Sequence, residues 1–235
     1  MSFAEKVVVI TGVGREGQIG EALASSFCEG GARVAAVDRS REHVVARVAA
    51  LIDAGFDARA FPCDLTDPAQ TTALSMDLEA SYGQVDVFVH AAGGFAMSGP
   101  VAESDPAVWN RMFSINLTSA YLATRALIPL LRVGGGAILY FGSTAVIDGG
   151  QSAGMAAYAA AKSGVLTLMR TVAQEEEGHG IRSNAIAPVA VRTTANVESM
   201  GTNARYVSRE EVAAVARFLC SDDAARITGE VIVMA

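Results

Sequence analysis

Short apolar runs alternate with longer segments of helical periodicity along the chain, and this alternation restricts the possible folds more than any other feature. The runs cover residues 7–10, 33–38, 85–90 and 137–141. Each run is apolar throughout rather than at every second position, which is typical of parallel strands covered by helices on both faces. Such strands are joined by right-handed crossovers. We therefore predict an α/β fold with a doubly wound parallel sheet, arranged as a three-layer α/β/α sandwich.

Length and composition limit the organisation and the partners of the chain. Its 235 residues contain no linker, repeat or low-complexity stretch, so we predict a single domain over residues 1–235. A hydrophobic fraction of 51% is far from the composition of disordered chains. The net charge of -7 would repel phosphate backbones, which argues against nucleic-acid binding. Without a signal peptide or an apolar run that could span a bilayer, we expect a cytoplasmic protein with no membrane partner.

The cysteines and histidines form no recognisable metal-binding pattern. Cys28, Cys63 and Cys220 contain no CxxC pair, and their odd number fits no closed disulfide framework. Neither an HExxH motif nor a zinc-like spacing occurs. We therefore expect reduced thiols and no catalytic metal.

Three helix starts can be located from their capping residues. Asp67 and Asp105 each precede a proline that would be the first helical residue. Ser208 and Glu211 have the spacing of a capping box. We predict that helices begin directly after Asp67, Asp105 and Ser208.

A glycine-rich segment, residues 11–20, follows the first predicted strand and opens a helix. Free backbone N–H groups and the helix dipole attract a pyrophosphate at such a turn, and glycines let the backbone approach it closely. A Gly-rich strand-to-helix turn can also be a merely tight connection. The segment alone is therefore a weak indication of dinucleotide binding.

Asp38 ends the second predicted strand, where a carboxylate can accept hydrogen bonds from the adenosine ribose hydroxyls of NAD. A 2'-phosphate there would meet a like charge, at a cost of roughly 1–4 kcal/mol at a separation of about 4 Å. Arg15 and Arg39 could offset part of this repulsion. The carboxylate could instead cap a helix or lie in a solvated turn. We expect NAD to be preferred, with NADP possible.

Tyr158 and Lys162 are four residues apart, which places them on the same face of a helix. A nearby ammonium can supply much of the roughly 4 kcal/mol needed to bring a phenol from a pKa near 10 to a pKa near 7. The YxxxK pattern also recurs by chance in helices where the tyrosine packs and the lysine snorkels. The pair predicts a proton-transfer centre only in combination with other motifs.

Together these motifs resemble the short-chain dehydrogenase/reductase family over nearly the whole chain. The family has a single Rossmann-like domain and an Asn-Ser-Tyr-Lys catalytic set, matched here in family order by Asn116, Ser143, Tyr158 and Lys162. The resemblance implies hydride transfer between a nicotinamide cofactor and a secondary alcohol or ketone, with Tyr158 as general acid or base and Ser143 bound to the substrate oxygen. It also implies that Lys162 binds the nicotinamide ribose and lowers the tyrosine pKa. Asn116 would anchor a water that links Lys162 to solvent.

The same resemblance implies a cofactor site along the carboxyl ends of the strands. Its expected residues are Gly12, Gly14, Gly17, Ile19, Gly20, Asp38, Asp64, Leu65, Ala92, Gly93, Tyr158, Lys162, Pro188, Val191 and Thr193. Three departures make local differences possible: the glycine-rich turn is two residues longer than usual, His90 replaces an asparagine, and Val189 replaces a glycine. We interpret His90 as a structural substitute at a strand end rather than as a catalytic base.

The substrate is expected among the loops that follow the same strands. The residues expected to line its site are Phe95, Ser143, Ala145, Met155, Tyr158 and Val189. Their apolar character favours a hydrophobic carbonyl or secondary alcohol, although apolar loop residues also serve simple packing. The substrate-loop region, about residues 189–207, is shorter than is common in the family, which predicts an open site.

Several alternatives stay open at this point. The nearest is an NADPH-dependent 3-oxoacyl-carrier-protein reductase, which shares the motifs. A SAM-dependent methyltransferase also has a glycine-rich first turn, but it does not explain the four-residue catalytic set. A non-catalytic dinucleotide-sensing protein would commonly lack the tyrosine or the lysine. By resemblance we expect a homo-oligomer, a dimer or tetramer, that pairs the helices carrying Asn116 and Tyr158.

Overall fold

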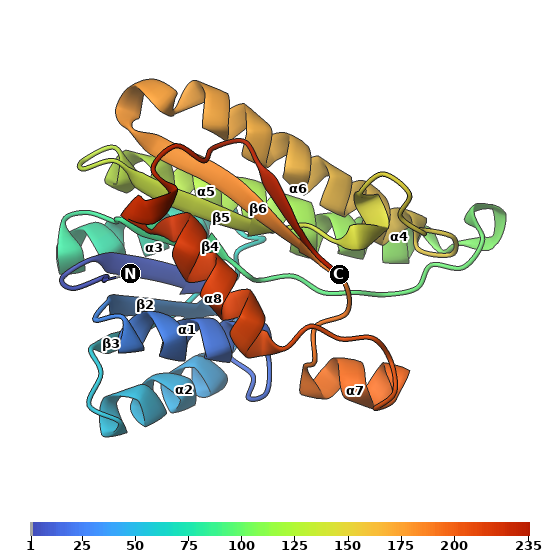
Figure 1. Ribbon diagram of the computed structural model, residues 1–235, viewed down its shortest axis with the longest axis horizontal. Helices are drawn as coiled ribbons and strands as arrows, with labels where there is room; N and C mark the ends of the chain where they lie inside the picture. Colours follow the sequence, from blue (N-terminus) through green and yellow to red (C-terminus); the bar gives the residue numbers. More distant parts are fainter. Residues whose placement is uncertain (1) are drawn as a thin grey trace.

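Seven parallel strands form one sheet in the computed structural model, which describes residues 2–235 (Figure 1). The strand order is β3-β2-β1-β4-β5-β6-β7. The strands are β1 (Val7–Thr11), β2 (Arg33–Asp38), β3 (Ala58–Pro62), β4 (Val87–His90), β5 (Gly136–Phe141), β6 (Ile181–Pro188) and β7 (Val231–Met234). The order reverses direction between β1 and β4, and ligands of such sheets bind beyond the carboxyl ends at this switch point.

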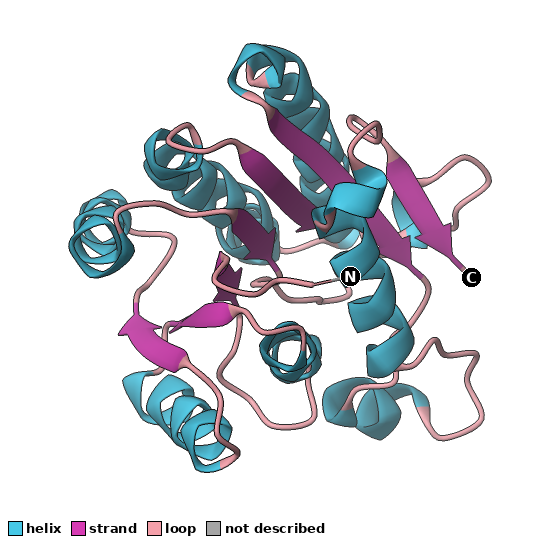
Figure 2. Cartoon of the chain, turned by 60° about the vertical axis from the view of Figure 1, so that its left-hand side comes forward, coloured by secondary structure: helices cyan, strands magenta, loops and turns pink. Residues whose placement is uncertain are grey.

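Helices cover both faces of the sheet, which confirms the predicted three layers (Figure 2). The apolar side chains of β1 alternate between the layers, with Val8 and Ile10 in one core and Val7 and Val9 in the other. One face packs against α1 (Ile19–Glu29), α2 (Arg41–Asp53) and α8 (Arg209–Cys220). The opposite face packs against α3 (Pro68–Tyr82), α5 (Ser119–Leu131) and α6 (Ala156–Glu175).

The predicted helix starts are confirmed by their capping contacts. Asp67 accepts hydrogen bonds from the N–H groups of Ala69 and Gln70, and Asp105 accepts one from Ala107 at the start of α4 (Pro106–Met112). Ser208 and Glu211 form the expected capping box at α8. Within residues 2–235, no helix is long and apolar enough to cross a membrane.

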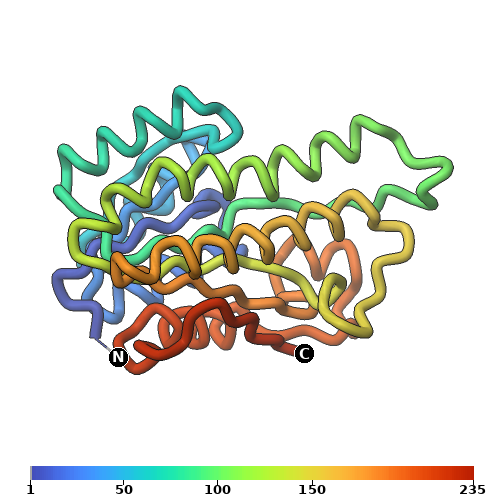
Figure 3. The backbone as a smooth tube through the Cα atoms, turned by 90° about the horizontal axis from the view of Figure 1, so that it is seen from above, coloured from blue at the N-terminus to red at the C-terminus, as the bar shows by residue number. Residues whose placement is uncertain are grey.

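Two local features differ from the simplest interpretation of the sequence. The segment 189–207, which was expected to be a short loop, contains the helix α7 (Thr194–Met200). Between α4 and α5 the chain forms a π-helical turn, η2 (Phe113–Thr118), so that α4, η2 and α5 make one long rod. This rod runs alongside α6, and α4 and η2 pack against it (Figure 3).

The close approach of this rod to α6 depends on a glycine. A Cβ atom built on Gly164 of α6 would lie 2.6 Å from Cδ2 of Leu117 in η2. A carbon atom at that position would require the Leu117 side chain to move. A side chain larger than hydrogen at residue 164 would therefore force this contact between α6 and the π-turn to repack.

Candidate active site

Tyr158 lies in the first turn of α6, and Ser143 follows the carboxyl end of β5. The Ser143 side chain influences the pKa of Tyr158, so the two hydroxyl groups are neighbours. The Ser143 hydroxyl oxygen accepts the N–H of Ala145 at 3.2 Å, which holds its position. Burial raises the pKa of Tyr158 above its ordinary value, and the Ser143 side chain opposes this. The phenol is therefore held protonated beside a second hydroxyl group, at the edge of the sheet where the family expectation puts the substrate oxygen.

Lys162 lies one helical turn after Tyr158, and its side chain is only 8% exposed. Its Nζ donates to the carbonyl oxygen of Phe141 at 2.8 Å and lies 5.8 Å from the centroid of the Tyr158 ring. Burial lowers the pKa of Lys162 to about 8. The expected lowering of the tyrosine pKa by Lys162 is not found in the polypeptide alone, where burial is the largest influence on Tyr158.

Asn116 lies in the π-turn η2 and is buried. Its Nδ2 donates to the carbonyl oxygens of Gly94 and Met112, each at 3.0 Å, and its Oδ1 accepts the N–H of Gly94 at 3.2 Å. A Cβ atom built on Gly93 would lie 2.6 Å from Asn116 Oδ1 and 3.8 Å from Lys162 Nζ. The structure therefore brings Asn116 and Lys162 together around the backbone of Gly93.

His90 bridges the first strand and the helical rod. Its Nδ1 lies 3.2 Å from Oγ1 of Thr11 and its Nε2 lies 3.4 Å from Oγ of Ser119. Ser119 donates its hydroxyl proton to the carbonyl oxygen of Ile115, and Thr11 accepts the N–H of Ala92, so the consistent tautomer carries its proton on Nε2. Burial, aided by the Lys162 charge, lowers the pKa of His90 to about 3. This side chain is neutral at physiological pH and links structural elements, as expected for a substitute at a strand end.

The glycine-rich turn leaves space that only glycine can provide. A Cβ atom on Gly14 would lie 2.5 Å from the carboxyl carbon of Asp38, and one on Gly20 would collide with the carbonyl oxygen of Gly12. Gln18, which precedes α1, makes no side-chain capping hydrogen bond. A bare helix start next to a carboxylate at the end of β2 suits the pyrophosphate and ribose of a dinucleotide, so the residues present fit a nicotinamide cofactor.

Other expected cofactor residues are engaged within the protein. The Asp64 carboxylate accepts hydrogen bonds from the N–H and hydroxyl groups of Thr66, and Leu65 is buried in the core. Thr193 caps α7 by accepting the N–H of Asn196, and Val191 is buried and paired with Val207. Their roles toward a cofactor stay predictions. The remaining members, Ile19, Ala92 and Pro188, lie at the start of α1, after β4 and at the end of β6.

The expected substrate residues differ in their relation to the Tyr158 side chain. Phe95 makes an edge-to-face contact with Tyr158 at a centroid distance of 5.0 Å and is exposed. Ala145 lies just after Ser143, and Met155 immediately precedes α6. Val189 donates its N–H to the carbonyl oxygen of Met234, so its backbone continues the pairing of β6 with β7. Of the residues expected to bind the substrate, Phe95 is the one whose ring contacts Tyr158.

Sequence reasoning missed an interaction at the glycine-rich turn. The N–H of Gly17 donates to the carboxylate of Glu21, and the carbonyl oxygen of Gly17 accepts the N–H of Thr194 at 3.1 Å. Both backbone polar groups of Gly17 therefore serve the protein, although Gly17 was expected to bind the cofactor. Glu21 could have been noticed as an acidic residue in the first turn of the predicted helix, where a negative charge is favourable. Its arginine partners, however, are distant in the sequence.

Comparison with known proteins agrees with this geometry. A family model described as enoyl-(acyl carrier protein) reductase matches residues 12–235. The 2-(S)-hydroxypropyl-CoM dehydrogenase 3 of Xanthobacter autotrophicus is 34% identical over 241 residues, which cover 95% of this chain and 92% of that protein. A short-chain dehydrogenase from Mycobacterium smegmatis has a similar structure, with a TM-score of 0.88 and 32% identity over 99% of this chain and 93% of the other. An NAD+-bound xylitol dehydrogenase structure gives a TM-score of 0.91 at 26% identity, covering 100% of this chain and 99% of the other. This chain belongs to the short-chain dehydrogenase/reductase family and is an NAD(P)-dependent oxidoreductase.

Proposed function

We propose that this enzyme transfers a hydride between NAD, preferred over NADP, and a secondary alcohol or ketone, with Tyr158 as the general acid and base. The observation that carries the proposal is the proximity of the Tyr158 and Ser143 side chains, with Lys162 buried one helical turn after Tyr158. The relatives named above support the substrate class, because a hydroxypropyl compound and xylitol are both alcohols. The exposed Phe95, which contacts the Tyr158 ring, favours an apolar substituent on the substrate.

In the reducing direction, Ser143 and Tyr158 both donate hydrogen bonds to the carbonyl oxygen. The bound nicotinamide supplies the hydride. Tyr158 transfers its proton to the oxygen as negative charge develops there, and its raised pKa keeps that proton available at neutral pH. The Lys162 ammonium stabilises the resulting phenolate, and Asn116 and Lys162 provide the polar groups through which Tyr158 regains a proton. Alcohol oxidation reverses these steps.

The proposed preference for NAD rests on Asp38. Its carboxylate accepts the N–H of Ser40 at 2.9 Å, which fixes it against Gly14 at the end of β2. A 2'-phosphate brought to this carboxylate would be repelled by roughly 1–4 kcal/mol. We expect kcat/KM to be at least about tenfold higher with NADH than with NADPH.

Replacement of Tyr158 by Phe tests the proposed proton transfer. Tyr158→Phe removes the hydroxyl and keeps the ring, so we expect kcat to fall by about 10²- to 10⁴-fold with unchanged NAD affinity. Turnover of ketones and alcohols would be followed by NADH absorbance, and NAD binding by calorimetry. Tyr82→Phe, at the end of α3, is the matched control, because the Tyr82 hydroxyl makes no hydrogen bond within the described residues. A Tyr158→Phe enzyme that retains normal turnover would refute the assignment.

Membership of the short-chain dehydrogenase/reductase family reduces the number of alternatives. A methyltransferase does not belong to this family. The NADPH-dependent 3-oxoacyl-carrier-protein reductase stays a hypothesis, and comparison of NADH with NADPH distinguishes it.

We also propose a homo-oligomer, supported by the exposed Trp109 and Tyr121 on the rod that carries Asn116. Light scattering would measure its size. The single domain and the cytoplasmic location remain predictions.

A further inference from the structure

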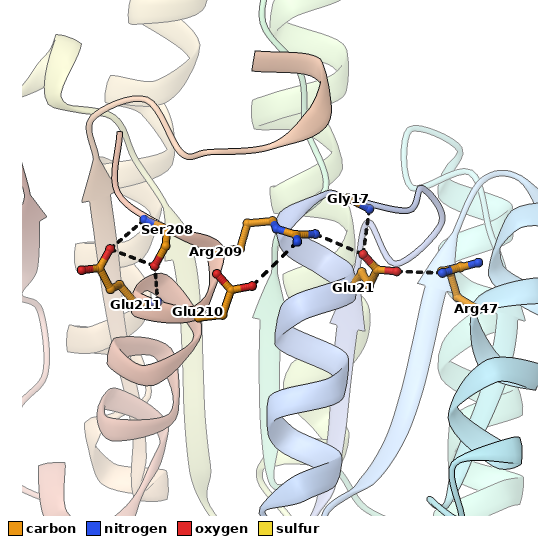
Figure 4. A network of polar contacts seen from close by, with 7 residues as sticks. All are labelled: Gly17, Glu21, Arg47, Ser208, Arg209, Glu210 and Glu211. Carbon is orange, nitrogen blue, oxygen red and sulfur yellow. Dashed lines mark hydrogen bonds and ion pairs between the residues drawn. The ribbon is translucent and has the colours of Figure 1, made fainter. Parts of the chain in front are cut away.

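Glu21 is the centre of an ion network that joins three separate parts of the chain (Figure 4). It lies in the first turn of α1. Its carboxylate accepts the N–H of Gly17 at 2.7 Å, a guanidinium N–H of Arg47 in α2 at 2.7 Å and one of Arg209 in α8 at 3.2 Å. The Glu21 side chain is 25% exposed. A partly buried carboxylate with three donors fixes geometry better than an isolated surface ion pair.

The segment 189–207, here called the lid, is held to the glycine-rich turn near both of its ends. Near its amino end, Thr194 donates its N–H to Gly17, and the first residue of α7 thus lies directly on the turn. At its carboxyl end, Arg209 follows the lid by two residues and binds Glu21. A Cβ atom on Gly17 would collide with the hydroxyl of Thr194, so this contact depends on glycine. Gly17 therefore contacts the lid directly, and Glu21 binds the residue that begins α8 just after the lid.

The contacts of Glu21 determine what it can do. Because its carboxylate takes up the N–H of Gly17 and two guanidinium groups, it is fully engaged in binding protein groups. Arg47 also approaches Glu16 of the turn at 3.7 Å, which adds a second, weaker contact to the same turn. Loss of the Glu21 charge would therefore loosen the turn, the start of α8 and the lid at the same time.

We propose that Glu21 is a positioning residue that couples the lid to the glycine-rich turn, so that the two segments order as one unit. In the proposed function the turn holds the dinucleotide and the lid covers the substrate, and the coupling to catalysis rests on that function. The lid is then ordered before substrate arrives, and binding of either ligand stabilises the site of the other. The coupling itself is a property of the protein without ligands.

Hydrogen exchange of the ligand-free protein tests the coupling without any assay of activity. We expect Glu21→Ala to accelerate amide exchange about fivefold in peptides from both residues 11–20 and residues 189–207, measured by mass spectrometry. Glu29→Gln, on the same helix two turns further along, is the matched control and should change neither segment. If Glu21→Ala accelerates exchange only in residues 11–20, the coupling is refuted. If Glu21→Ala is too unstable to study, Glu21→Gln removes the charge that pairs with Arg47 and Arg209 but keeps an acceptor for Gly17, and faster exchange is then expected in residues 189–207; unchanged exchange there would refute the coupling.

A double-mutant cycle then identifies the partner. Arg209→Ala should accelerate exchange of the lid in the native background and have little further effect in Glu21→Gln, because the interaction is already lost. Arg209→Lys should restore part of the protection.

In the active enzyme, Glu21→Gln should raise the NAD dissociation constant and the substrate KM together, each about fivefold, with a smaller change in kcat. Additive effects in the cycle, or a change in kcat alone, would overturn the proposal. Absence of all turnover in the native protein would instead refute the proposed function and leave the exchange result valid.

Discussion

The catalytic centre and the contact between turn and lid both lie beyond the carboxyl ends of the strands, yet they hold charge in opposite ways. At the centre, the ammonium of Lys162 is buried, with a neutral carbonyl as its hydrogen-bond acceptor and a neutral histidine close by. At the turn, the carboxylate of Glu21 is paired with two guanidinium groups and remains partly exposed. A buried charge without a counter-ion destabilises the fold, whereas a paired, partly exposed charge does not. The comparison indicates that the centre is adapted to chemistry and the turn to positioning.

Removal of the buried ammonium should have the largest effect. We expect Lys162→Met to lower kcat by about 10²- to 10⁴-fold, because the phenolate loses its stabilising charge. The same variant should have a higher free energy of unfolding than the native protein at pH 7. The lowering of the Lys162 pKa from 10.5 to about 8 means that burial of the ammonium costs roughly 3 kcal/mol, and the variant avoids this cost. Chemical denaturation at pH 7 measures the difference. Lower stability of Lys162→Met at pH 7 would contradict the comparison.

The pH dependence of stability gives an independent check on Lys162. Between pH 8 and about pH 10.5 the unfolded chain binds this proton and the folded protein has released it, so the free energy of unfolding should rise with pH. Below pH 8 both states are protonated and the cost of burial is complete. The stability difference between the native protein and Lys162→Met should therefore shrink as the pH increases through this interval. A difference that is independent of pH would show that the burial of this charge has been misjudged.

Loss of the histidine bridge should have an intermediate effect confined to the centre. We expect His90→Leu to lower the free energy of unfolding by roughly 1–3 kcal/mol, because Thr11 and Ser119 each lose a buried hydrogen bond. His90→Asn keeps a polar side chain and should cost less. The loss measured by chemical denaturation should be about 1 kcal/mol smaller at pH 6 than at pH 8, because the unfolded histidine, with an ordinary pKa of 6.5, gains a proton at pH 6 while the folded ring, with a pKa of about 3, stays neutral. A loss that is the same at pH 6 and pH 8 would show that the folded ring also becomes charged at pH 6.

A methyl group on the turn should have a smaller effect on stability. We expect Gly17→Ala to cost about 1–2 kcal/mol, because residue 17 has a φ of +72° and its new methyl group would displace Thr194. Gly178→Ala is the control, since a Cβ atom there meets nothing within 4 Å and its φ is not positive. Chemical denaturation compares the two variants. Equal behaviour of both would show that the lid does not rest on Gly17.

The smallest effect is expected at the helix that anchors the lid. Ser208→Ala removes half of the capping box at the start of α8, and the melting temperature should decrease by about 2 °C. Because Arg209 is the first residue of α8, a loosened start should also weaken its contact with Glu21. Calorimetry measures the first effect, and exchange in residues 189–207 measures the second. A change of more than about 6 °C would indicate that the cap supports more than one helix.

The sequence was sufficient where local chemistry decides the structure. The strand over residues 33–38 has the predicted bounds, and Asp67, Asp105 and Ser208 cap the predicted helices. The proposed catalytic set rests on its motif spacing, and the structure brings Tyr158 near Ser143 and Asn116 near Lys162. The contact of Glu21 with Arg209 joins residues 188 positions apart, and no local pattern specifies such a pair. The π-turn around Asn116 and the helix at Thr194 were missed because both depend on packing against distant elements.

The absent side chain at Gly164 has a consequence for how the catalytic groups could change during evolution. Helix α6 carries Tyr158 and Lys162, and through Gly164 it also determines how near the π-turn with Asn116 can come. A larger residue at position 164 would press against the side chain of Leu117, the neighbour of Asn116 in the chain. Variation at residue 164 would therefore change the packing between the two helical segments while the four proposed catalytic side chains stay the same.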